Sequence, residues 1–155
     1  MAAGLLLAVG VAGGLWVGRP RSSLAEDVVG HMAGEPQAWD RTNRISAQLP
    51  TVLRAAQMRL SPSAGLVSYA NSCLFRGYLV PHLVVQSASG PVTVMVLVHE
   101  SVPAPVRFDE QGYRGMILPM PGHGSVAVLV RDQDADLKSV ERMALMLRGA
   151  IGWKA

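Results

Sequence analysis

Four polar side chains lie in or beside an otherwise apolar part of this 155-residue chain. Cys73 and Arg76 precede a hydrophobic run, and His82 lies inside that run. Glu100 follows a second hydrophobic run. Because a thiol, a guanidinium, an imidazole and a carboxylate can all bind a ligand or a partner protein, we expect these four residues to form the site.

A metal centre is the most specific chemistry that these residue types could support. Ligand-type side chains recur along this part of the chain: Cys73, His82, His99, Glu100 and His123. None of them has the short paired spacing, such as CxxC or HExxH, that is typical of zinc sites. We therefore predict no metal and no other cofactor. His82 is interpreted as a core or strand-edge histidine that is hydrogen-bonded to a backbone carbonyl.

Nucleophilic catalysis by Cys73 is a second hypothesis, because a thiolate beside a base such as His82 can attack a substrate. No nucleophile signature surrounds this cysteine, and a lone thiol often packs as a small buried hydrophobe. We therefore predict no catalytic residues and no enzyme activity. The alternative is a thiol-based redox sensor or an enzyme that uses Cys73.

Two strands must position these side chains. Leu79–Gln86 and Val92–His99 are rich in β-branched residues, and the segment 87–91 between them contains Gly90 and Pro91, so a hairpin is predicted. Both strands are apolar on both faces, which indicates a sheet that is covered on both sides or dimerised. Pro81 lacks an amide donor, so we expect it at an edge, a bulge or a strand start.

The remaining pattern predicts an α+β fold. Ser23 and Glu26 have capping-box spacing and begin a helix that ends near Gly34, where His31 is interpreted as a partly exposed helix-end residue. Further elements are expected at a helical patch with Trp39, Ile45 and Leu49, a helix Thr51–Leu60, strands near 66–70, 106–108, 116–118 and 125–130, and a last helix capped by Asp132 or Asp134. The prediction is two or three short helices, a mostly antiparallel sheet of about five strands, and a C-terminal helix.

The N-terminal segment Ala2–Gly18 contains no charged or polar side chain, which favours a transmembrane helix near the lower length limit. A cleaved signal peptide is the alternative, although no basic region precedes the apolar run. The predicted organisation is a transmembrane anchor over 1–21, a helical linker region over 22–63, and an α+β domain over 64–155 that is continuous with the helices.

Charge and cysteine content exclude some classes of function. The formal net charge is +3, but the basic residues are scattered and have no interleaved aromatic residues, so we predict no nucleic-acid partner. The single cysteine excludes an intrachain disulfide framework. Arg19 and Arg21 follow the apolar segment, and a positive-inside count on these two residues would place the domain in the cytoplasm.

Three segments together resemble a known family. They are Cys73–Glu100, His31-x-x-x-Glu35-Pro36 and Gly122-x-Gly124-Ser125-Val126-Ala127-Val128. They resemble an uncharacterised bacterial family of single-pass inner-membrane proteins with an anti-sigma-factor-like layout, and the likeness covers roughly 24–130. It implies an inner-membrane protein with its C-terminal domain in the periplasm, which outweighs the two arginines. The layout's cytoplasmic half, which binds sigma factor, has no counterpart here, so that activity is assigned to no residue.

The predicted function is therefore a membrane-anchored periplasmic domain that binds or senses an unknown ligand, as a part of an anti-sigma-like regulator. Its expected partners are the lipid bilayer and a protein partner or second copy. The alternative is a structural or interaction module that forms a homodimer or binds another envelope protein.

Overall fold

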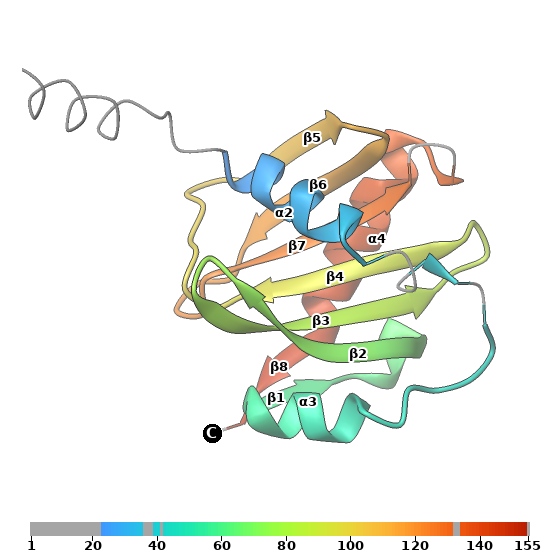
Figure 1. Ribbon diagram of the computed structural model, residues 1–155, viewed down its shortest axis with the longest axis vertical. Coiled ribbons are helices and arrows are strands. Elements are labelled where there is room, and N and C mark those ends of the chain that lie inside the picture. The colour runs from blue at the N-terminus through green and yellow to red at the C-terminus, as the bar shows by residue number, and fades with distance from the viewer. Residues whose placement is uncertain (1–22, 36–38, 41, 132–133, 155) are drawn as a thin grey trace, which may run out of the picture.

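The computed structural model describes residues 23–35, 39–40, 42–131 and 134–154. Its main element is a six-stranded antiparallel sheet in the order β2-β3-β4-β7-β6-β5 (Figure 1). The strands are β2 (Leu66–Phe75), β3 (Tyr78–Gln86), β4 (Pro91–Leu97), β5 (Val106–Glu110), β6 (Tyr113–Pro119) and β7 (Ser125–Arg131). A separate two-stranded sheet pairs β1 (Met58–Leu60) with β8 (Ile151–Trp153).

Helices cover both faces of the main sheet. α4 (Leu137–Ala150) lies on one face, together with α3 (Leu49–Ala55) and the short 3₁₀ helix Pro62–Ala64. α2 (Leu24–Ala33) lies on the other face (Figure 1). Two hydrophobic clusters follow from this arrangement, one between the sheet and α4 and one between the sheet and α2. The predicted covering of both faces is confirmed, and a second copy is not needed to cover the central strands.

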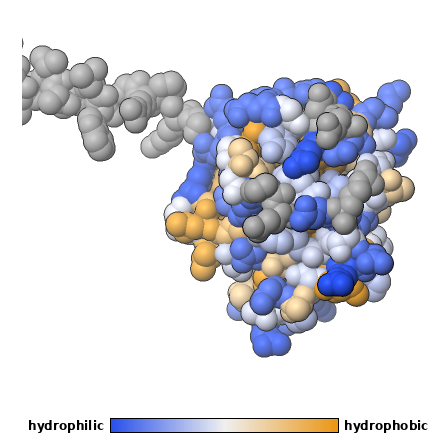
Figure 2. Space-filling view, turned by 45° about the vertical axis from the view of Figure 1, so that its right-hand side comes forward, coloured by the Kyte–Doolittle hydropathy of each residue, from blue (hydrophilic) through white to orange (hydrophobic). Residues whose placement is uncertain are grey.

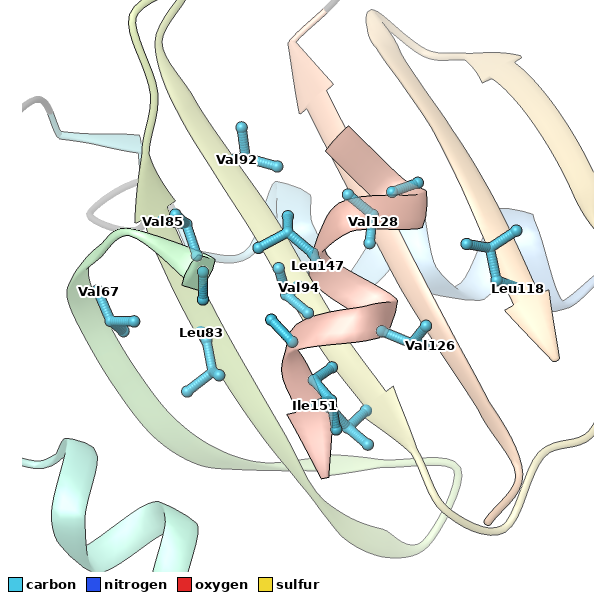
Figure 3. Packing of buried hydrophobic residues seen from close by; sticks show 14 of the residues in the cluster. Val67, Leu83, Val85, Val92, Val94, Leu118, Val126, Val128, Leu147 and Ile151 are labelled. Carbon is cyan, nitrogen blue, oxygen red and sulfur yellow. The ribbon is translucent and has the colours of Figure 1, made fainter. Parts of the chain in front are cut away.

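The cluster under α4 is almost entirely aliphatic. Figure 3 shows Leu147 of α4 between valines of the central strands, with Val94 and Val128 nearby. Val126, Val128 and Val130 of β7 share this face, as their alternation predicted, because successive strand residues point to opposite sides of the sheet. This half of the core therefore provides stability and contains no candidate chemistry.

The predicted hairpin is present as β3 and β4, joined by a turn in which Ser87 and Gly90 exchange two backbone hydrogen bonds of 3.0 and 3.2 Å. Pro81 faces Ser72 of β2, and the pairing of β3 with β4 begins only at His82. The missing amide of Pro81 therefore falls where β3 has no partner on its β4 side, which agrees with the expected edge position.

Several element predictions were wrong in detail. The main sheet has six strands where about five were expected, although each of the six overlaps a segment predicted as a strand. The helix expected over Thr51–Leu60 ends at Ala55, since Gln57 adopts a positive φ of 54° and the chain then enters β1. The partner of β1 is β8 at the other end of the sequence, which local periodicity cannot reveal.

Of the helical patch expected with Trp39, Ile45 and Leu49, Trp39 is in 3₁₀ conformation, Leu49 begins α3 and Ile45 is not helical. Trp39 is buried beside Tyr113 of β6, with ring centroids 5.4 Å apart, whereas Ile45 is 70% exposed and residues 42–46 are not helical. The N-cap of α4 is Asp136, two positions after the predicted Asp134, and the prediction for Asp132 lies outside the described residues.

The predicted transmembrane segment, residues 1–21, lies outside the residues that the structure describes. Among the described residues, no helix has both the length and the apolar character required to cross a membrane. The capping box at the start of α2 is confirmed: Ser23 Oγ accepts from the Glu26 amide, and the Glu26 carboxylate accepts from the Ser23 amide.

The apolar stripe of α2 fixes the helix on the sheet. Ala25, Val28, Val29 and Met32 are buried at i, i+3, i+4 and i+7, and the last three have no exposed surface. We expect Met32→Ala to lower the free energy of unfolding by about 2–5 kcal/mol, because it leaves a cavity under α2. Denaturant unfolding of the purified full chain in detergent measures this loss.

The matched control is Met146→Ala, because Met146 lies on the outer side of α4 and is 47% exposed. This change should stay within about 0.5 kcal/mol of the parent. Equal losses at the two methionines would contradict the docked position of α2.

Candidate functional site

The candidate site is a cluster of His31, Glu35, Cys73 and His82 under the C-terminal end of α2. One ligand-type atom from each of these four residues lies within 4.8 Å of the others. His31 is in the last turn of α2, and Glu35 follows the C-cap residue Gly34. Cys73 comes from β2 and His82 from β3. Three separate elements therefore supply the cluster.

Strand register places the thiol and the imidazole side by side. Cys73 pairs with Val80, and Asn71 pairs with His82. Cys73 and His82 therefore lie on neighbouring strands and on the face that α2 covers. They are diagonal neighbours, because His82 is two residues after Val80, the partner of Cys73. The distance from Cys73 Sγ to His82 Nδ1 is 3.6 Å. Both side chains are buried, His82 completely.

The Glu35 carboxylate is the centre of the cluster. Its Oε1 lies 3.3 Å from His31 Nε2 and accepts a hydrogen bond of 3.2 Å from the Cys73 thiol. Its Oε2 lies 3.0 Å from His82 Nδ1 and accepts a hydrogen bond of 3.0 Å from the Tyr69 hydroxyl. Both oxygens are thus shared between two neighbours. One carboxylate therefore links α2 to both strands.

Burial and this carboxylate hold the thiol and the phenol in their neutral forms. Desolvation, and then the hydrogen bond and charge of Glu35, raise the pKa of Cys73 to about 12. Desolvation is also the main cause that raises the pKa of Tyr69 to about 12, against a hydrogen bond from Asn71 that lowers it. Without a cation in the site, neither group ionises at neutral pH.

The pKa values of His82 and Glu35, in contrast, are lowered. Desolvation lowers the pKa of His82 to about 4, although the Glu35 charge acts to raise it, so the imidazole is neutral at pH 7. For Glu35, desolvation acts to raise the pKa. The hydrogen bond from Cys73, the electrostatic interaction with His82 and the hydrogen bond from Tyr69 together outweigh desolvation and lower the pKa of Glu35. The site therefore places one carboxylate beside a neutral thiol, a neutral phenol and the neutral imidazole of His82.

This geometry does not form a catalytic triad. In a triad the base contacts the nucleophile through one ring nitrogen and the orienting carboxylate through the other. Here the same atom, His82 Nδ1, lies next to both Cys73 and Glu35, and His82 Nε2 is buried with no hydrogen-bond partner among the described residues. Together with the raised thiol pKa, this arrangement argues against a thiolate nucleophile.

The same geometry fits a tetrahedral metal ion. Metal–ligand bonds of about 2.0–2.3 Å at tetrahedral angles place neighbouring ligand atoms about 3.3–3.8 Å apart. The contacts from His31 to Glu35, from Glu35 to Cys73 and from Cys73 to His82 are 3.3, 3.2 and 3.6 Å. Three of the six distances in such a set therefore already suit a tetrahedral ion, and all four ligand atoms lie within 4.8 Å of one another.

A comparison of the whole sequence shows the family. The family described as "Protein of unknown function (DUF3379)" matches residues 1–146. The chain belongs to the DUF3379 family. No curated protein and no solved structure matches the chain. The expected likeness to an uncharacterised family is thus confirmed at the level of a family of unknown function. The inner-membrane, anti-sigma-like layout stays a prediction.

The four site residues expected from the DUF3379 sequence divide into two pairs. Cys73 and His82 meet in the cluster, as described above. Arg76 and Glu100 instead form an ion pair of 3.1 Å, and Arg76 Nε also donates to Asp27 of α2 at 2.6 Å. This second group of charges is partly exposed and joins α2 to the turn between β2 and β3.

The other predicted ligand-type residues lie elsewhere in the structure. His99 stacks on Tyr78 with ring centroids 3.9 Å apart, and His123 stacks on Trp153 at 4.3 Å. His123 also lines an open cavity of about 400 Å³ with Leu79, Pro81 and Trp153, on the α3 side of the sheet. That cavity is lined mainly by apolar residues and does not include any residue of the cluster.

Sequence reasoning missed His31 and Glu35 as site residues. The interpretation of His31 as a partly exposed helix-end residue was incomplete, because its ring lies 6.0 Å from those of Phe75 and His82. A signal was present in the i, i+4 spacing of His31 and Glu35 at the end of an amphipathic helix, since such residues lie on one face. Only the docking of α2 shows which strand residues they meet.

The raised pKa of Cys73 predicts an inert thiol in the metal-free protein. At pH 8 we expect iodoacetamide to label the native chain at least roughly a thousandfold more slowly than the chain unfolded in urea, since almost no thiolate is present. The measurement is the time course of alkylation by mass spectrometry in the presence of a chelator.

The variant Ser101→Cys supplies an exposed thiol in the same chain and should take up one label rapidly. Rapid labelling of Cys73 itself in the native chain would contradict the assigned protonation state and would favour thiol chemistry.

Proposed function

We propose that this DUF3379 domain binds a first-row transition-metal ion, best matched by Zn²⁺, through His31, Glu35, Cys73 and His82. The observation that carries the proposal is the convergence of four ligand atoms of suitable types within 4.8 Å of one another, from one helix end and two strands. This proposal replaces the prediction from the sequence that the chain binds no metal, and the unknown ligand of the expected binding or sensing domain is then the metal ion.

The set of ligands supports this class of metal. Thiolate and imidazole are favoured by Zn²⁺ and its neighbours in the first row, whereas Mg²⁺ and Ca²⁺ prefer oxygen ligands throughout. Binding displaces the proton of the Cys73 thiol, because the thiolate is the ligand form. A divalent cation also reverses the local electrostatics, since the negative charge that keeps Cys73 protonated is then neutralised.

The number of ligands supports binding rather than catalysis. Four protein ligands fill a tetrahedral shell, whereas catalytic zinc sites keep one position open for water or substrate. The side chains of His31 and Glu35 are 18% and 23% exposed, so an ion can reach the site from solvent. A coordination shell that is filled by protein ligands, but that solvent ions can reach, suits a metal sensor or a metal-stabilised domain.

Surrounding side chains also support the site. The Tyr69 hydroxyl holds Glu35 Oε2, and Asn71 in turn donates to the Tyr69 hydroxyl at 3.3 Å. Such outer hydrogen bonds orient a metal ligand and raise the affinity of the site for its ion. The Tyr69 hydroxyl can still donate to Glu35 Oε2 after metal binding has displaced the proton of Cys73.

The cellular setting is part of the proposal. We place the domain in the periplasm, joined to the bacterial inner membrane by a single-pass anchor. The support is the apolar segment Ala2–Gly18 and the resemblance described above. On this proposal the metal-binding domain is the sensing half of an anti-sigma-like regulator.

Metal titration tests the site directly. We expect the chelator-treated full chain to bind one Zn²⁺ per chain, and Co²⁺ in its place to give thiolate-to-metal charge-transfer absorption and intense tetrahedral d–d bands. At a free metal concentration of 100 times the dissociation constant, the folded state should gain about 2.7 kcal/mol. Calorimetry, absorption spectra and thermal unfolding measure these three effects.

Variants separate a metal site from a simple hydrogen-bond network. Cys73→Ser should abolish the charge-transfer band, and Tyr69→Phe should weaken binding by roughly 10–100-fold while keeping the band. His123→Ala is the matched control, since that histidine lies outside the cluster, and should change neither. A parent chain that folds but shows no saturable Zn²⁺ or Co²⁺ binding refutes the proposal.

Topology is tested separately by reporter fusions after Ala155. A periplasm-active reporter should be active and a cytoplasm-active reporter inactive, because the apolar segment would leave the domain outside the cytoplasm. The reverse pattern would favour the count of Arg19 and Arg21 and would remove the periplasmic placement without affecting the metal site.

A further inference from the structure

The turn between β2 and β3 presents an exposed hydrophobic tip. Leu74 and Leu79 form a cross-strand pair and are 68% and 67% exposed, and Tyr78 is 49% exposed. Because neighbouring residues point to opposite sides of a strand, the tip is apolar on both faces of the hairpin. Isolated exposed hydrophobic residues are common, but three at one hairpin end indicate a contact surface. We call Leu74, Tyr78 and Leu79 the hairpin tip.

The hairpin tip lies beside the start of α2. Arg76, in the turn of the hairpin, bonds to Asp27 in the first turn of α2 at 2.6 Å. Figure 1 shows the β2–β3 turn and the start of α2 on the same side of the molecule. Figure 2 shows hydrophobic side chains gathered along one side of the molecule. The chain therefore enters the domain at the edge that carries the tip.

The sequence limits how far this edge can lie from the apolar segment. Residues 19–23 separate Gly18 from Leu24 at the start of α2. The six steps from Gly18 to Leu24, at about 3.5 Å each, reach no more than about 21 Å. If Ala2–Gly18 spans the bilayer, the hairpin tip therefore lies close to its surface.

We propose that the hairpin tip inserts into the headgroup region of the lipid bilayer and fixes the orientation of the domain on the membrane. This inference rests on the membrane anchor in the proposed function and is independent of the metal site. Interfacial segments of this kind bury their apolar face about 5–10 Å into the boundary between headgroups and acyl chains.

The chemistry of the tip suits this environment. Tyrosine is enriched at membrane interfaces because its ring is apolar and its hydroxyl is polar, and Tyr78 is held by the stacked ring of His99. The charge of Arg76 is turned inward to Asp27 and Glu100. The insertion of Leu74 and Leu79 therefore requires no unpaired charge to leave water.

Photo-cross-linking from the tip tests the inference. The full chain with Leu79→p-benzoylphenylalanine is reconstituted in vesicles of phosphatidylethanolamine and phosphatidylglycerol and then irradiated. The matched control is Leu145→p-benzoylphenylalanine, because Leu145 is 51% exposed on α4, away from the hairpin. We expect lipid adducts by mass spectrometry at position 79, severalfold above those at position 145.

Each other outcome overturns the inference. A covalent dimer from position 79 would assign the tip to a second copy of the chain, and the absence of any adduct would leave the tip in water. Equal lipid labelling at both positions would show that the domain has no fixed orientation. Flotation of the vesicles tests the anchor, and Zn²⁺ titration of the same sample tests the metal site, so a failure of the proposed function is recognised separately.

Discussion

The carboxylate of Glu35 is the constraint on which the rest of this site depends. It carries a negative charge into the space between α2 and the sheet, where a charge without partners would be costly. Two strands and the end of the helix supply its neighbours, which are Cys73, His82, His31 and Tyr69. Burial, and then this charge, raise the pKa values of the thiol and the phenol and keep both protonated. In the metal-free domain this carboxylate is thus surrounded by close polar neighbours, and on the proposal above a divalent ion would enter by displacing the Cys73 proton.

The two faces of the sheet divide stability from chemistry. The face under α4 buries a continuous aliphatic cluster and can hold the strands in place without any polar contribution. The face under α2 contains the completely buried His82 and its polar neighbours beside an apolar cluster that includes Val28, Val29 and Met32. A site that changes its charge on binding needs such support, because a rigid surrounding shell keeps the ligands in place when their protons leave.

The sequence predicted the sheet better than it predicted the site, for a physical reason. The β3–β4 hairpin and the alternation of β7 depend on neighbours in the chain, so turn residues and β-branched runs reveal them. The cluster depends on tertiary docking: Cys73 lies 38 residues from Glu35 and only 9 from His82. Short-range patterns in the sequence can reveal the pair of Cys73 and His82, but they miss the pair of Cys73 and Glu35. The contact between Trp39 and Tyr113 is likewise tertiary, and no short spacing in the sequence reveals it.

One strand pair connects the cluster with the edge at which the chain enters the domain. Cys73 and Leu74 are adjacent residues of β2, and His82 lies only three positions after Leu79 on β3. α2 is tied to this pair twice, by the Asp27–Arg76 contact near its start and by His31 and Glu35 at its end. Paired strands transmit displacement because a slip in register would turn every side chain to the opposite face. The cluster and the hairpin tip therefore belong to one strand pair, which α2 contacts near its start and at its end.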